Sequence, residues 1–250
     1  IMTGVFKKVV ISDYISINFV DRIFDAPALY TGLENLLGIY GYTLQIYCDF
    51  SGYSDMAIGM GLMCGFHYKE NFDYPYISSS VTEFWRRWHI SLGSWFRDYL
   101  YIPLGGNRVS KSRNILNLFL VWFLTGLWHG ANWTFIVWGL IFFVLISFEK
   151  ITGVQNKQGI VSSFFLRCYT LFFVLLGWVL FRSKSIALAV LYMKSMFGLN
   201  ANAFSDGLFL GWFKQNLILL AVGTVLCTPA FHKLGKKTEN CEMMNYLKVV

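Results

Sequence analysis

The sequence predicts an all-α, polytopic integral membrane protein with broken or re-entrant helices. Of its 250 residues, 56% are hydrophobic, 19% are aromatic and 14% are charged, a balance too apolar for a soluble globular domain. Residues 115–148 contain no charged side chain, and residues 160–181 contain only Arg167. Such long apolar stretches are typical of helices that cross a bilayer.

The net charge and the cysteine and histidine spacings exclude other classes of protein. The formal net charge is +7, and basic residues are expected in loops and interfacial helices that meet anionic lipid. No basic cluster has the pattern of a nucleic-acid module, so we expect no nucleic-acid partner. The cysteines lack CxxC spacing and the histidines never lie three to five residues apart, so neither a disulfide framework nor a metal site is expected. These residues are Cys48, Cys64, Cys168, Cys227 and Cys241, and His67, His89, His129 and His232.

The chain begins at Ile1 and runs directly into residues 1–30, where apolar and charged positions are mixed around Lys7 and Lys8. This pattern favours a helix along the bilayer surface, closed by Pro27. It is not the pattern of a signal peptide, because a clean apolar core is missing. We therefore expect the chain to be the C-terminal part of a longer protein, with transmembrane helices upstream.

Two short apolar runs, residues 35–48 and 56–67, flank the polar segment Asp49–Asp55. Each run is shorter than the ~20 residues that a straight span requires, so we predict short, broken or re-entrant helices around a polar break. Irregular backbone at membrane depth is tolerated only where protein or a wet cavity surrounds it. We expect Asp49 and Asp55 to bond exposed backbone or line a cavity, with a structural role favoured over a catalytic one.

Residues 68–114 are the most polar part of the chain, and they predict an interfacial and loop region with one amphipathic helix. Ser80 and Glu83 match the S-x-x-E capping box that begins a helix. The charged face of this helix includes Arg86 and Arg87, which either meet lipid headgroups or hold a phosphate-bearing donor. The opposite face is mainly aromatic. Helical spacing places on it Trp85, Trp88, His89, Leu92, Trp95, Phe96 and Tyr99.

Residues 115–148 are too long for one straight span. A continuous helix would extend about 50 Å at ~1.5 Å per residue, against a hydrocarbon core of ~30 Å. Two glycines, an asparagine and a histidine interrupt residues 126–132, so we predict a break there or a steep tilt. A polar loop is expected over residues 149–159, and residues 160–181 and 207–231 are expected to form further spans.

His129 lies inside this apolar stretch and is the first candidate for catalysis. An ionisable residue at membrane depth is costly in its charged form, which makes it a functional candidate. Desolvation lowers a histidine pKa, so a buried imidazole is neutral near pH 7 and can take a proton from a hydroxyl, as a general base does in acyl transfer. The alternative is a structural imidazole bonded to helix backbone.

His89 is the second candidate, because helical spacing places it on the aromatic face with Trp85 and Trp88. Taken alone, it fits an interfacial histidine with a satisfied ring as well as it fits a functional group. Two histidines that both point inward, in a chain with only four, favour the functional interpretation. We expect His89 to orient a substrate or move a proton.

Several motifs together resemble the membrane-bound O-acyltransferase (MBOAT) family. The likeness is greatest to its bacterial alginate O-acetyltransferase branch, which is related to the D-alanyl transferase of teichoic acids. It covers residues 1–148 closely, whereas residues 149–250 resemble the family only as a run of helices. The motifs are YCDFSGYSDMAIG at 47–59, EFWRRWHISL at 83–92, WFRDY at 95–99, IPLGGN at 102–107 and LTGLWHG at 124–130. No G-x-S-x-G, Walker or H-E-x-x-H motif is present.

The resemblance implies one membrane-embedded domain over residues 1–250, with helices around a tunnel and a catalytic segment at residues 115–148. It implies that His129 is the catalytic histidine and that His89 is the second functional position. Departures are small: Cys48 stands where the branch often has Phe, and Asn132 where a small residue is common. We expect the tunnel to be lined by Trp85, Trp88, Trp128, Asn132, Asp49 and Asp55.

The implied reaction moves an acyl group, expected to be acetyl, onto hydroxyls of a cell-surface or exported polysaccharide. No bound cofactor is expected; acetyl-CoA or an acyl carrier is the co-substrate. The expected setting is the cytoplasmic membrane of a bacterium, with the lipid bilayer, the polysaccharide, and an acyl-carrier or periplasmic or extracellular acetylation protein as partners.

Two alternatives stay open from the residues alone. In the first, a transporter or channel uses the two histidines as a proton relay and the broken helices as a permeation path. That protein would give flux in liposomes without an acyl donor, and it predicts inverted repeats, which are not found in the sequence. In the second, a non-catalytic scaffold of a polysaccharide synthesis complex would tolerate loss of both histidines.

Overall fold

The structure, a computed structural model, describes residues 1–156, 159–200 and 203–230, and this part of the chain contains helices and loops but no strand. The first helical stretch consists of α1 (Met2–Val5), α2 (Asp13–Ile15) and α3 (Asp21–Asp25), joined by π-helical turns at Phe6–Ser12 and Ser16–Val20. The remaining helices are α4 (Gly32–Met63), α5 (Val81–Arg87), α6 (Ile90–Phe96), α7 (Lys111–His129), α8 (Trp133–Thr152), α9 (Ile160–Arg182), α10 (Ile186–Met196) and α11 (Phe209–Leu226).

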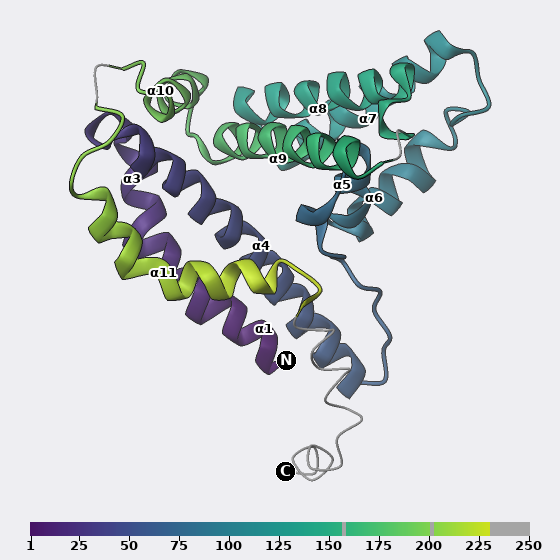
Figure 1. The fold of residues 1–250 in the computed structure, drawn as a ribbon. Coiled ribbons are helices and arrows are strands. Elements are labelled where there is room, and N and C mark those ends of the chain that lie inside the picture. The colour runs from purple at the N-terminus through teal and green to yellow at the C-terminus, as the bar shows by residue number, and fades with distance from the viewer. Residues whose placement is uncertain (157–158, 201–202, 231–250) are drawn as a thin grey trace.

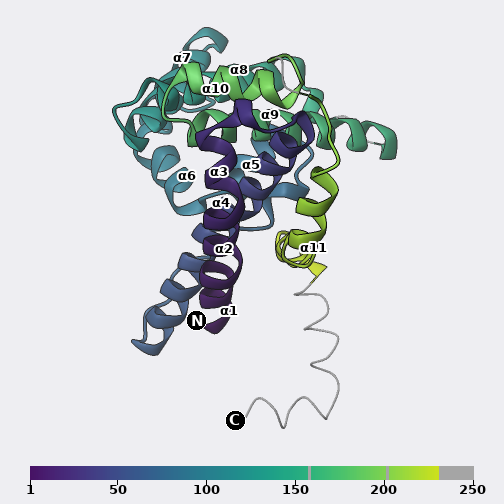
Figure 2. The ribbon, with the colours of Figure 1, turned by 90° about the vertical axis from the view of Figure 1, so that its left-hand side faces the viewer.

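The helices form two groups, which Figure 1 shows side by side. In one group, α1–α3 and α11 pack along the long helix α4; in the other, α7, α8 and α9 pack together above α5 and α6. Figure 2 shows that α4 and the first helical stretch extend together away from the second group. Contacts of α9 and α10 with α4 join the two groups.

The N-terminal stretch is helical and ends before Pro27, as predicted. Its apolar side, however, is buried against protein, since Ile11, Ile15 and Phe19 have at most 1% of their surface exposed. The stretch contacts α4 along its length, and Phe19 also lies against Trp212 of α11, with ring centroids 5.9 Å apart. It is therefore part of the core.

The predicted break at Asp49–Asp55 was wrong, because α4 continues through it from Gly32 to Met63. The polar residues serve helix packing. Lys7 Nζ lies 2.8 Å from the Asp55 carboxylate, and Lys8 pairs with Asp49. Small residues allow the close approach, since a Cβ added to Gly52 would lie 2.7 Å from a backbone oxygen of α1. Ion pairing with a neighbouring helix thus keeps these carboxylates on a regular helix.

The predicted break between α7 and α8 is confirmed. α7 ends at His129, Gly130 follows with φ of +147°, and the Asn132 side chain caps α8 by accepting from Thr134 N. The two helices then pack closely, because a Cβ on Gly139 would lie 2.5 Å from a backbone oxygen of α7. This short connection holds His129 at the end of one helix and beside the next.

Three helices of the described chain, α8, α9 and α11, are long and apolar enough to cross a membrane. Helices α9 and α11 agree with the spans predicted over residues 160–181 and 207–231, the last residue of which lies outside the described part. The predicted loop at 149–159 begins too early, since α8 runs to Thr152 and Glu149 is fully buried.

Candidate functional site

The single amphipathic helix predicted from Ser80 to Tyr99 is interrupted at its centre. Ser80 caps α5 as expected, with Glu83 N donating to Ser80 Oγ at 2.9 Å. The backbone then becomes extended at Trp88, and His89 adopts left-handed angles of φ 47° and ψ 56° before α6 begins. A non-glycine residue in this region costs about 1–2 kcal/mol, so other contacts hold it there.

The N-terminus of α5 is held by Glu149, a carboxylate of α8 with no exposed surface. Val81 N donates to Glu149 Oε1 at 2.7 Å, and Thr82 N and Oγ1 donate to Oε2 at 2.8 and 2.6 Å. The first amides of a helix lack partners within the helix, and a carboxylate is favoured there by the helix dipole. Glu149 thus fixes α5, and with it Trp85 and His89, against α8.

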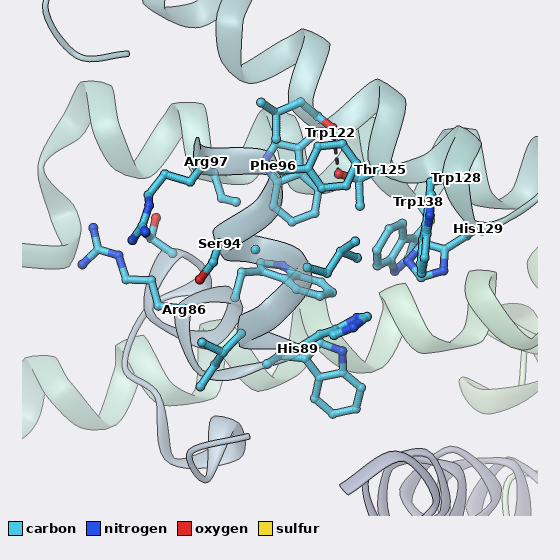
Figure 3. Close-up of a pocket in the computed structure, with 18 of the residues that line it drawn as sticks. Arg86, His89, Ser94, Phe96, Arg97, Trp122, Thr125, Trp128, His129 and Trp138 are labelled. Carbon is cyan, nitrogen blue, oxygen red and sulfur yellow. Dashed lines mark hydrogen bonds between the residues drawn. The ribbon is translucent and has the colours of Figure 1, made fainter. Parts of the chain in front are cut away.

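A cavity of about 830 Å³ opens between α5, α6, α7, α8 and α9 (Figure 3). Most of its wall is apolar, and aromatic side chains are the largest group in it. The polar groups come from α4, α5, α6 and α7, from the turn at His89 between α5 and α6, and from Arg97 directly after α6. The wall includes Phe50, Trp85, Trp88, Trp122, Trp128, Trp138, Trp178 and Phe181, with Asp49, Thr82, Arg86, His89, Ser94, Arg97, Thr125 and His129 as the main polar groups.

Both candidate histidines line this one cavity. The His129 ring lies 5.2 Å from Trp138 and 5.0 Å from Phe181, measured between ring centroids. The His89 ring meets Phe50 of α4 edge-on at 4.5 Å. Trp128 contacts both imidazoles, at 4.9 Å from His129 and 6.2 Å from His89. The site therefore brings together two histidines from separate elements around one indole.

Burial affects the protonation of His89, which lies between α5 and α6. It lowers the pKa of this imidazole to about 4. Within the described chain neither ring has a hydrogen-bond partner. His89 is consequently neutral at pH 7 and free to accept a proton.

The cavity has two ends, which Figure 3 shows apart. Arg86 and Arg97 lie at one end, and Trp128, His129 and Trp138 lie at the other. Arg97 is paired with Asp98 at 2.7 Å, and both side chains are largely exposed. The sequence pattern placed Arg86 on the outer face of the helix, whereas the structure places it on the cavity wall.

Of the residues predicted to line a tunnel, the cavity wall contains Trp85, Trp88, Trp128 and Asp49. Two others lie outside it. Asp55 pairs with Lys7, and Asn132 caps α8 while its Nδ2 donates to the backbone oxygen of Lys184 at 3.0 Å. The structure assigns both of these side chains to helix packing.

Sequence analysis missed several wall residues. Trp122 and Thr125 lie seven and four positions before His129 on α7, so helical spacing could have placed them on its face. Trp178 and Phe181 come from α9, and no local pattern connects that helix to the two histidines. His232 and Cys241 lie outside the described residues.

Fold and site together define a helical membrane protein with a cavity, rich in aromatic side chains, that is lined by two histidines. Comparison with known families agrees with this description. The model of the MBOAT, membrane-bound O-acyltransferase family matches residues 24–191. The chain belongs to this family.

Curated relatives extend the comparison. A probable alginate O-acetylase AlgI of Pseudomonas syringae pv. tomato is 50% identical over 246 residues, covering 96% of this chain and 46% of the relative. A peptidoglycan O-acetyltransferase of Helicobacter pylori is 41% identical over 199 residues, covering 79% and 38%. A teichoic acid D-alanyltransferase of Bacillus subtilis is 36% identical over 135 residues, covering 50% and 34%. The chain thus spans less than half the length of each of these relatives.

Proposed function

We propose that this chain carries the acyl-transfer site of a membrane-bound O-acyltransferase that moves an acetyl group onto hydroxyls of a cell-surface or exported polysaccharide. The observation that carries the proposal is the pairing of His129 and His89 in one aromatic cavity. Membership of the MBOAT family supports the reaction class. The names of two relatives, an alginate O-acetylase and a peptidoglycan O-acetyltransferase, support acetyl as the group and a glycan polymer as the acceptor.

In the proposed reaction His129 is the general base. Its neutral imidazole removes the proton of the acceptor hydroxyl while the hydroxyl oxygen bonds to the acyl carbonyl carbon. The bond from that carbon to the donor's sulfur or oxygen then breaks, and the leaving group takes the proton from the imidazolium. His89 assists by positioning a substrate or passing a proton. The donor is acetyl-CoA or an acyl carrier, and no resident cofactor enters the scheme.

The aromatic wall suits this chemistry because it excludes water from the activated acyl group and so limits hydrolysis. We place the protein in the cytoplasmic membrane of a bacterium, where the donor reaches His129 from one side and the polysaccharide from the other. An acyl carrier, or an acetylation protein outside the membrane, is the partner that this arrangement needs.

The test compares cells that express the wild-type protein, His129→Ala and His67→Ala. His67 is an exposed histidine remote from the cavity and is the matched control. Mass spectrometry of the surface polysaccharide is expected to show O-acetyl groups with the wild type and the control and to show none with His129→Ala, at equal protein levels in the membrane. Normal acetylation by His129→Ala would overturn the proposal, and it would favour a scaffold role.

A further inference from the structure

We propose that Asn71 is a positioning residue for His89, because its two carbonyl oxygens hold the left-handed turn that keeps the imidazole in the cavity. The inference rests on the proposed function, in which His89 belongs to the acyl-transfer site. Asn71 lies in the loop between α4 and α5 and does not line the cavity. It therefore acts through His89, and not on a substrate.

The contacts of Asn71 converge on the residues that follow His89. The Asn71 backbone oxygen accepts from Ile90 N at 3.0 Å. Its side-chain Oδ1 accepts from Ser91 N at 3.1 Å and from Ser91 Oγ at 3.0 Å. Ile90 and Ser91 supply the first amides of α6, which have no partner within the helix. Asn71 thus substitutes for the missing turn of helix.

The same side chain joins this turn to α4. Asn71 Nδ2 donates to Ser54 Oγ at 3.3 Å, and Ser54 lies four residues after Phe50 on α4. Residues at this spacing share a helix face, and Phe50 is the residue that the His89 ring contacts at 4.5 Å. One short stretch of α4 therefore supplies both the anchor of Asn71 and a wall for the imidazole.

The residues just before His89 are tied to the same loop. Asp73 N donates to the Arg87 backbone oxygen at 3.0 Å, and Arg87 Nη1 donates to the Asp73 carboxylate at 2.9 Å. The loop thus forms hydrogen bonds with the chain on both sides of His89. Without these bonds, the amphipathic pattern from Ser80 to Tyr99 favours one continuous helix, which would move His89 away from its observed place.

The experiment measures acetyl transfer in membranes that contain the whole protein, with [14C]acetyl-coenzyme A as donor and deacetylated alginate as acceptor. Three variants are compared with wild type. Asn71→Ala removes the side-chain acceptor, and Asn71→Asp keeps an oxygen for both Ser91 donors. Asn18→Ala is the matched control, since Asn18 makes one exposed bond to the Tyr14 backbone oxygen.

Asn71→Ala is expected to lower kcat roughly 10- to 100-fold, the size of effect that a misplaced catalytic group produces, with KM for the donor within about twofold of wild type. Asn71→Asp is expected to keep kcat within about threefold, and Asn18→Ala to match wild type. An unchanged kcat in Asn71→Ala, a change in KM alone, or an equal loss in Asn71→Asp would overturn the inference. Failure of the proposed function would be recognised by a different result, because His129→Ala would then still transfer acetyl groups.

Discussion

Removal of the Glu149 side chain is expected to destabilise the protein strongly. In Glu149→Ala, Val81 N and Thr82 N would lose their acceptor at a buried helix start. A buried donor without a partner costs about 1–3 kcal/mol, and bonds to a charged acceptor are at the upper end of that range. Two amides and the hydroxyl of Thr82 together give about 3–5 kcal/mol. For a chain of this size that corresponds to a fall in Tm of roughly 6–20 °C.

Thermal unfolding in detergent, followed by tryptophan fluorescence, measures this fall. Glu149→Gln keeps one acceptor oxygen, so it is expected to lose about half as much as Glu149→Ala. Glu70→Ala, at an exposed position of the loop after α4, is the control and is expected to leave Tm unchanged. A Tm for Glu149→Ala within about 2 °C of the wild-type value would refute the assignment of Glu149 as the anchor of α5.

Three further predictions follow from other parts of the structure. Protonation of His89 is expected to lower the acyl-transfer rate only toward pH 4, because burial lowers the pKa of this imidazole to about 4; an acid limb from His89 centred near pH 6.5 would contradict this. The unfolded chain binds a proton at His89 at a higher pH than the folded chain does, so the contribution of His89 to stability is present above pH 6.5 and is lost as the pH falls toward 4. Gly139→Ala is expected to lower Tm, since its Cβ would lie 2.5 Å from the backbone oxygen of Trp122, and overpacking of this kind costs about 1–3 kcal/mol; an unchanged Tm would show that α7 and α8 can separate freely. Asp55→Asn breaks a partly exposed ion pair with Lys7 and is expected to cost at most about 1 kcal/mol, with acetyl transfer near wild type; loss of acetyl transfer would instead give Asp55 a role in the reaction.

Local signals were sufficient to predict the break that presents His129. Gly130 ends α7 at a positive φ, and Asn132 caps α8 with its own side chain. Each of these effects depends on residues within four positions of the break, so it can be predicted from the local sequence. The apolar helices α9 and α11 were predictable for the same reason, because length and composition alone define a candidate span.

Distant partners explain what the sequence pattern failed to predict. The carboxylates of Asp49 and Asp55 indicated a break, but Lys8 and Lys7 neutralise them from another helix and α4 stays regular. At His89 the sequence pattern instead predicted a continuous helix, and the structure has a turn. The loop near residue 71 accepts the hydrogen bonds that a continuous helix would make within itself. In both places tertiary contacts outweighed the local pattern.

The C-terminal end of α8 explains how two histidines from different elements reach one cavity. Glu149 holds the N-terminus of α5, and the next residue, Lys150, donates to Asn107 Oδ1 at 2.6 Å beyond the end of α6. Adjacent residues of one helix thus fix both ends of the segment that carries His89. His129 is fixed to α8 as well, through the tight packing of α7 on it and the contact with Trp138. Because the end of α8 at Glu149 and Lys150 holds the segment of His89, whereas Trp138 and Gly139 hold α7 and His129, a disturbance at that end should displace His89 and leave His129 in place.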